Sequence, residues 1–177
     1  MAKFVALLRG INVGGKNKIR MQELREALSD IGLDDVQTYI QSGNIVFNSE
    51  GKEPGLAKSI SDSIKSRWKI DVPTIVCSAR SWNSFVKQNA FLNMDLKFLA
   101  LTVLAKPPKK SLSAAIQKNE KDFLPDQFKI VTNRIYLYFP NGFSKTKLTN
   151  NYFESKLETV ATTRNWRTVL KLQEMLQ

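Results

Sequence analysis

The sequence contains no histidine and a single cysteine, Cys77, among its 177 residues. Without histidine, the chain cannot use an imidazole as a general acid or base, form a Ser-His or Cys-His pair, or bind a metal through a ring nitrogen. One cysteine excludes an internal disulfide and leaves too few ligands for a zinc site. The absence of an internal disulfide fits a reducing compartment. We therefore expect a cytoplasmic protein with no cofactor and no metal.

Long hydrophobic runs are also absent. The apolar run closest to the start, residues 4–8, is too short for the core of a signal peptide or for a membrane span. We expect no membrane partner.

Basic residues are in clear excess. Lysine and arginine number 27 against 16 acidic residues, which gives a formal net charge of +11. Such an excess favours nucleic acid or anionic small molecules as partners, although a basic surface without any ligand has the same composition. Hydrophobic residues make up 42% of the chain, enough for a real core.

The first half predicts strands and helices in an alternating order. Residues 3–9 are apolar without alternation, as in a central strand that is covered on both faces. Glycine and polar residues predict a loop at 10–19, and apolar residues at helical spacing predict a helix at 20–31. The remaining predicted elements are a strand hairpin at 36–40 and 44–48, a helix at 54–68, a strand at 72–78 and a short helix at 82–87.

The second half repeats this order. It predicts a strand at 97–105, a helix at 111–119, a hairpin at 128–132 and 134–139, a basic loop at 140–149, a helix at 150–157, a strand at 159–162 and a last helix at 164–176. Residues 79–87 also match residues 163–171 at a constant offset of 84, with Arg80 and Trp82 matching Arg164 and Trp166.

This pattern predicts an α+β fold of two ferredoxin-like β-α-β-β-α-β units, each with antiparallel strands and a trailing helix. The expected units are residues 1–92 and 93–177, either closely packed or forming one domain.

Several motifs resemble the bacterial family 1697 of domains of unknown function. They are residues 5–19 and 38–47, and in the second half residues 144–148 and 163–168. Two departures are Arg20, where the family often has proline, and Lys147, which separates Lys145 from Leu148. The resemblance implies a tandem ferredoxin-like fold and no particular activity.

The loop after the first strand is the main candidate site. In a ferredoxin-like unit, the first strand-to-helix loop and the hairpin tip lie at the same end of the sheet. Four basic residues, at positions 9, 16, 18 and 20, occur there with no acid between them, and glycine loops before a helix suit anions. The candidate ligand-binding residues are Arg9, Gly10, Asn12, Gly14, Gly15, Lys16, Asn17, Lys18, Gln41, Ser42 and Asn44.

An alternative interpretation of this loop is structural, in which the glycines form tight turns and the amides tie the loop to the hairpin. The pattern is neither a Walker motif nor a dinucleotide fingerprint, so it does not indicate an ATPase or a dehydrogenase.

A second basic cluster is expected in the second half. It comprises Lys145, Lys147, Arg164, Asn165, Trp166 and Arg167. Arginine beside an aromatic ring suits a phosphate or a base. The alternative is that Thr162 or Thr163 caps the last helix while Trp166 packs in the core.

Two further features have simpler explanations. Tyr136 and Tyr138 share one face of a strand, as the base-stacking aromatics of RNA-recognition modules do, but packing inside the protein is the stronger expectation. Cys77 is most simply a small strand residue.

The leading hypothesis is a protein that binds a phosphate-bearing ligand, nucleic acid before a metabolite. The alternatives are an enzyme that acts on a phosphorylated small molecule at the same pocket, and a structural or interaction protein without a ligand. The residues indicate no catalytic base.

Overall fold

The first sheet forms around β1 (Ala2–Leu8), in which all residues from Phe4 to Leu8 are buried. The computed structural model describes residues 1–177. The other elements of this half are α1 (Met21–Asp30), β2 (Asp34–Tyr39), β3 (Asn44–Ser49), α2 (Glu53–Trp68), β4 (Thr74–Ser78) and α3 (Ala79–Lys87). The strand order is β2-β3-β1-β4, and β1 is antiparallel to both of its neighbours.

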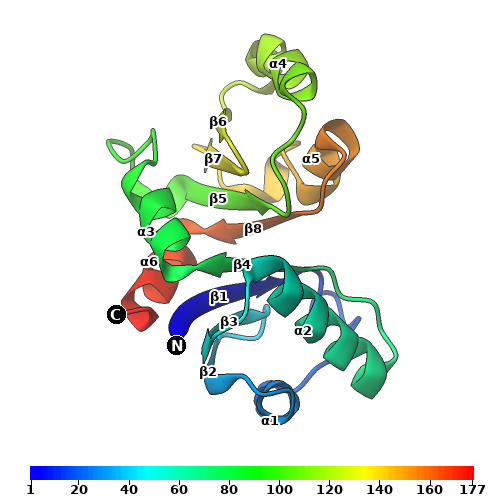
Figure 1. Cartoon of the computed structure of the whole chain (residues 1–177). Helices are drawn as coiled ribbons and strands as arrows, with labels where there is room; N and C mark the ends of the chain where they lie inside the picture. Colours follow the sequence, from blue (N-terminus) through cyan, green and yellow to red (C-terminus); the bar gives the residue numbers. More distant parts are fainter. The chain divides into compact units, whose positions relative to one another are not determined.

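Helices α1 and α2 pack on one face of this sheet (Figure 1). Leu24 and Leu28 of α1 and Ile60 of α2 join Phe47 of β3 in one hydrophobic cluster. On the opposite face of the sheet, Val5 and Leu7 of β1 have no exposed surface, so this face is buried as well. The expectation of a first strand covered on both faces is confirmed.

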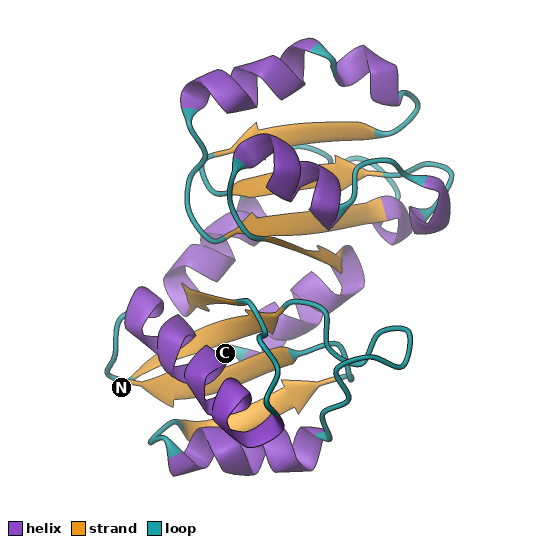
Figure 2. Cartoon of the chain, turned by 90° about the vertical axis from the view of Figure 1, so that its right-hand side faces the viewer, coloured by secondary structure: helices purple, strands orange, loops and turns teal.

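The second sheet repeats this plan. Its elements are β5 (Leu99–Leu104), α4 (Lys110–Lys118), β6 (Gln127–Val131), β7 (Arg134–Tyr138), α5 (Asn150–Leu157), β8 (Ala161–Asn165) and α6 (Trp166–Met175). The order is β6-β7-β5-β8, the counterpart of the first sheet. Figure 2 shows helices and strands alternating through both halves. The predicted α+β fold of two ferredoxin-like units is confirmed.

The chain divides into two compact units. One comprises Met1–Ser84 with Leu172–Gln177, and the other comprises Phe85–Lys171. The boundary that the sequence analysis placed between the two repeats, at residues 92 and 93, stays a prediction. No helix combines the length and the apolar composition needed to cross a bilayer.

Two details of the sequence-based prediction were wrong. The last strand extends to Asn165, because Thr163 and Arg164 continue the ladder with β5. Thr162 and Thr163 therefore do not cap α6. Instead, the Asn165 side-chain oxygen accepts the N–H of Thr168 at 2.9 Å.

The offset of 84 between the halves is also not the structural one. Leu8 of β1 pairs with Thr74, and Leu104 of β5 pairs with Ala161. The last strands therefore correspond at an offset of 87 (161 minus 74). The two offsets differ by three residues, which is close to one helical turn. Trp82 and Trp166 are therefore both buried on their helices, although they do not occupy equivalent positions.

Candidate functional site

The loop between β1 and α1, residues 9–20, is held closed by Asn12. The Asn12 side-chain nitrogen donates to the carbonyl oxygens of Ile19 (2.9 Å) and Gln41 (2.8 Å), and its side-chain oxygen accepts the N–H of Ile19 (2.9 Å). One side chain thus joins both ends of the loop to the hairpin tip. The predicted juxtaposition of loop and hairpin is present.

The tip of the loop is a tight turn. The N–H of Lys16 donates to the carbonyl of Val13 at 3.1 Å, with Gly14 and Gly15 between them at φ values of +58° and +75°. Two consecutive residues with positive φ are typical of a type I′ turn, and glycine adopts that backbone with the least strain. The two glycines therefore have a conformational role in the turn.

Other predicted site residues also serve the loop architecture. The Asn17 side chain donates to the carbonyl of Gly10 at 2.9 Å. Asn44 is fully buried, and its side-chain nitrogen donates to Tyr39 O (3.1 Å) and Ser42 Oγ (3.0 Å). Amides held in this way fix the shape of the loop and the hairpin and do not reach toward a ligand.

A cavity of about 570 Å³ opens beside the loop. It gathers part of the predicted set, namely Asn12, Gly15, Lys18 and Gln41. The other predicted residues do not line it: Arg9, Gly10, Gly14, Lys16, Asn17, Ser42 and Asn44. The remaining lining residues are Ile19, Arg20, Glu23 and Trp68. The structure thus narrows the candidate site to one side of the loop.

Trp68 is the lining residue that sequence reasoning did not assign to the site. It is the last residue of α2, the helix that the sequence predicted at residues 54–68. It does pack against the core in part, but its ring also reaches the cavity. The Arg67 guanidinium carbon lies 5.4 Å from the centre of that ring. A tryptophan at the end of a helix, next to an arginine, was the available indication of this second role.

Positive charge prevails in the cavity. Lys18 and Arg20 are exposed, and the only carboxylate among the lining residues is Glu23, whose oxygen lies 3.7 Å from an Arg20 nitrogen. Arg20 is 86% exposed, so this pair is screened and holds the guanidinium only weakly. Both cations can therefore turn toward an anionic group.

The second basic cluster does not form one site. Lys145 and Lys147 line a small cavity of about 170 Å³ together with Asp122 and Asp126, whose carboxylates oppose an anion. That cavity does not include the rest of the predicted cluster, Arg164, Asn165, Trp166 and Arg167.

The later half of the cluster has structural roles. Arg164 donates to Thr162 Oγ1 (2.8 Å) and to the Thr163 carbonyl (3.0 Å), and Trp166 is 1% exposed. Packing and capping explain Arg164, Asn165 and Trp166 better than ligand binding, whereas Arg167 is exposed.

Tyr136 is closed off as a stacking platform. It is fully buried, its hydroxyl donates to the carbonyl of Phe85 at 2.8 Å and accepts from Arg134 Nε at 2.8 Å, and burial raises its pKa. Tyr138 is half-buried beside Phe91, with ring centres 6.3 Å apart.

Cys77 is buried, and burial raises the pKa of its thiol to about 12, so it is not a reactive thiolate at neutral pH.

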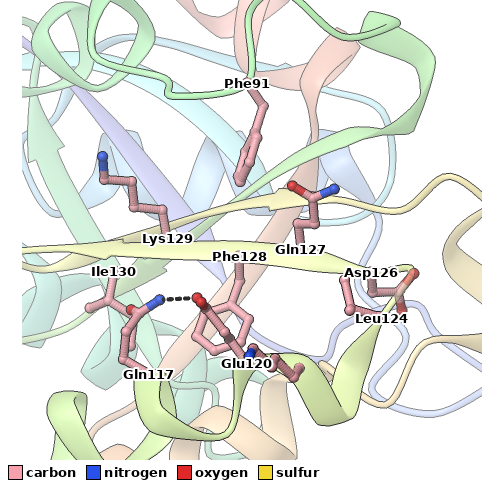
Figure 3. Close-up of a pocket in the computed structure, with 10 residues that line it drawn as sticks. Phe91, Gln117, Glu120, Leu124, Asp126, Gln127, Phe128, Lys129 and Ile130 are labelled. Carbon is pink, nitrogen blue, oxygen red and sulfur yellow. Dashed lines mark hydrogen bonds between the residues drawn. The ribbon is translucent and has the colours of Figure 1, made fainter.

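Another cavity, of about 610 Å³, lies along the edge strand β6 (Figure 3). Figure 3 shows Phe91 and Lys129 on one side of the strand and Gln117, Glu120 and Phe128 on the other. Gln117 donates to Glu120 at 2.8 Å. The negative charges of Glu120 and Asp126 balance the positive charges of the two lysines that line this cavity. It therefore suits an anionic ligand less well than the cavity beside residues 9–20.

Comparisons with known proteins bear on the fold. A family model described as "Protein of unknown function (DUF1697)" matches residues 1–136, which include the whole loop and its cavity. A solved structure, that of the conserved bacterial protein SP0830 from Streptococcus pneumoniae, is similar at 24% identity and a TM-score of 0.75, covering 99% of each chain. No curated protein matches the chain. A similarity of this kind establishes the architecture and leaves the activity to the site itself.

Proposed function

The chain belongs to the DUF1697 family of proteins of unknown function, and we propose that it binds a phosphate-bearing ligand, nucleic acid in preference to a small metabolite, at the cavity beside residues 9–20. The observation that carries the proposal is the convergence of Lys18 and Arg20 on one cavity with a single, solvent-screened carboxylate. A pair of cations at a concave surface favours anions.

The wider charge supports nucleic acid over a metabolite. The loop contributes four cations within twelve residues and no acid, and the whole chain carries +11. A polyanion gains from each of these charges through release of condensed counterions, whereas a single phosphate gains from only two or three of them.

An enzyme acting on a phosphorylated small molecule is the second candidate. The cavity volume of about 570 Å³ falls in the range of small-molecule sites, roughly 300–1,000 Å³. Its one carboxylate, Glu23, is the only lining group that could act as a general base there.

Binding of labelled oligonucleotides tests the proposal. Fluorescence polarisation with single-stranded RNA, single-stranded DNA and duplex DNA at about 50 and about 200 mM salt should show affinity that falls steeply with salt. A thermal-shift screen of nucleotides and phosphorylated metabolites runs beside it. A shift with one metabolite and no oligonucleotide binding would favour the enzyme instead, and no response in either assay would leave the loop as architecture.

A matched pair of double variants locates the site. Lys18→Ala/Arg20→Ala and Lys106→Ala/Lys110→Ala remove the same charge, and all four side chains are exposed. We expect the first variant to lose roughly tenfold in affinity and about 1.4 from the salt slope for single strands, and the second to change affinity by less than about twofold. Equal losses would show diffuse surface charge and contradict a site at the loop.

A further inference from the structure

Resting on the proposed function, we infer that the cavity beside residues 9–20 accepts one unstacked nucleotide, with its phosphate at Lys18 and Arg20 and its base against the indole of Trp68. The ligand is therefore single-stranded nucleic acid. The inference adds the base to a site otherwise argued from phosphate alone.

Trp68 differs from the other two tryptophans in its surroundings. Trp82 and Trp166 have relative exposures of 0% and 1%, so their rings are wholly committed to the core. Trp68 is half-buried: it packs partly on the hydrophobic cluster of the first sheet and partly lines the cavity. It is thus the one indole of the chain that a ligand can reach.

The surroundings of this indole match those of a base-stacking platform. Sites for single-stranded nucleic acids combine cations that contact the backbone with an aromatic side chain on which a base stacks. Here Lys18, Arg20 and Trp68 line the same cavity. The guanidinium of the exposed Arg67 lies over the indole, 5.4 Å from the ring centre, so a base stacks on this face once that side chain moves aside. The exposed Gln41 also lines the cavity and offers an amide at its edge.

A base in a duplex cannot occupy such a site. Its faces are covered by neighbouring base pairs, and its removal from the stack carries a free-energy cost. Because Trp68 lines a concave part of the surface, a base has to leave its stack to reach the ring, which favours a single strand over a duplex.

An abasic oligomer isolates the contribution of the base. We expect a single-stranded 12-mer to bind roughly tenfold to a hundredfold more tightly than an abasic sugar-phosphate chain of the same length and charge. Trp68→Leu, which keeps apolar packing but removes the aromatic ring, should lower the affinity of the base-bearing strand to the abasic level. Trp68→Phe should restore part of it, and neither variant should change abasic binding or the salt slope.

Fluorescence gives an independent readout. Because Trp82 and Trp166 are buried, quenching of tryptophan emission by the base-bearing strand should come from Trp68 and disappear in Trp68→Leu. Thermal unfolding of each variant shows whether the core contact of Trp68 survives.

The outcomes separate the two proposals. One outcome overturns the base site and leaves the phosphate site standing. In that outcome abasic and base-bearing strands bind equally and Trp68→Leu has no effect, while Lys18→Ala/Arg20→Ala still weakens binding. If duplex binds as tightly as single strand, the base site is also overturned. If no strand binds at all, both proposals fail.

Discussion

The two units have the same strand order but differ at the loop that follows the first strand of each. In the first unit twelve residues, 9–20, connect β1 to α1, and in the second unit five residues, 105–109, connect β5 to α4. Both loops begin with the same backbone contacts: Leu8 and Leu104 each donate to a hairpin carbonyl at 2.8 Å. The scaffold is thus shared, and the extra residues of the longer loop build the cavity.

The shorter loop shows what the fold alone requires. It contains Pro107 and Pro108, and the Lys109 side chain donates to Glu158 at 3.3 Å. Both loops lack acids, but the longer one has four basic residues against the two lysines of the shorter one, and it adds a glycine turn and the Asn12 clamp. Because connection of a strand to a helix needs none of these, the longer loop is where this protein differs from a plain duplicated scaffold.

The hairpin tip gives the largest expected effect on this comparison. Gly43 has φ +77°, and an added Cβ would lie 2.5 Å from the Cβ of Leu8. The equivalent residue of the second unit, Asn133, carries a side chain. We expect Gly43→Ala to lower the free energy of unfolding by about 3 kcal/mol, from strain and overlap together.

Chemical denaturation measures this loss. Gly10→Ala is the matched control, since Gly10 has φ +75° and nothing within 4 Å of an added Cβ. It should cost about 1 kcal/mol. Similar losses for the two variants would show that the contact with Leu8 does not constrain the tip.

The Asn12 clamp gives the next largest effect. Asn12→Ala removes three hydrogen bonds and places alanine at φ +53°. We expect a loss of about 2 kcal/mol in unfolding free energy and weaker oligonucleotide binding, because the loop opens. Asn17→Ala, which removes one exposed bond, should cost about 1 kcal/mol or less. Unchanged hydrogen exchange at the Ile19 amide in Asn12→Ala would contradict the clamp.

The smallest expected effect is a pH dependence of folding stability that arises from Cys77 in β4. The equivalent residue of β8 in the second unit is Arg164, which has no thiol. Burial raises the pKa of the Cys77 thiol to about 12, above its ordinary value of 9.0. The unfolded chain therefore loses this proton first, and folding stability falls as the pH rises from about 9 toward 12. At pH 10 the loss should be about 1 kcal/mol.

Urea unfolding at pH 7 and pH 10 checks this dependence. Cys77→Ala lowers stability at both values but should remove about 1 kcal/mol of the difference between them. Tyr136, whose pKa is also raised, contributes in the same direction in both proteins and so cancels from the comparison. An unchanged pH difference in Cys77→Ala would exclude the thiol as the cause.

The sequence predicted most elements because their patterns are local. The apolar run of residues 3–9 indicated β1, and the four-residue spacing of Ile60 and Ile64 indicated α2. The end of the chain was harder to predict. Thr163 and Arg164 form strand because they pair with β5, a partner sixty residues away that no local pattern reveals.

The sequence by itself determined the duplicated α+β fold, the meeting of the first loop with the hairpin and the excess of positive charge. Hydrophobic periodicity and glycine placement act over a few residues, so they can be read directly. Only the tertiary structure decided which polar residues serve the loop and which line the cavity. Asn17 and Asn44 turn their amides to backbone carbonyls and Asn12 does so while it also lines the cavity, whereas Trp68 reaches the cavity from the end of a helix fifty residues after Lys18. The physical reason is that a hydrogen-bond partner or an exposed ring face depends on distances between segments that are far apart in the chain.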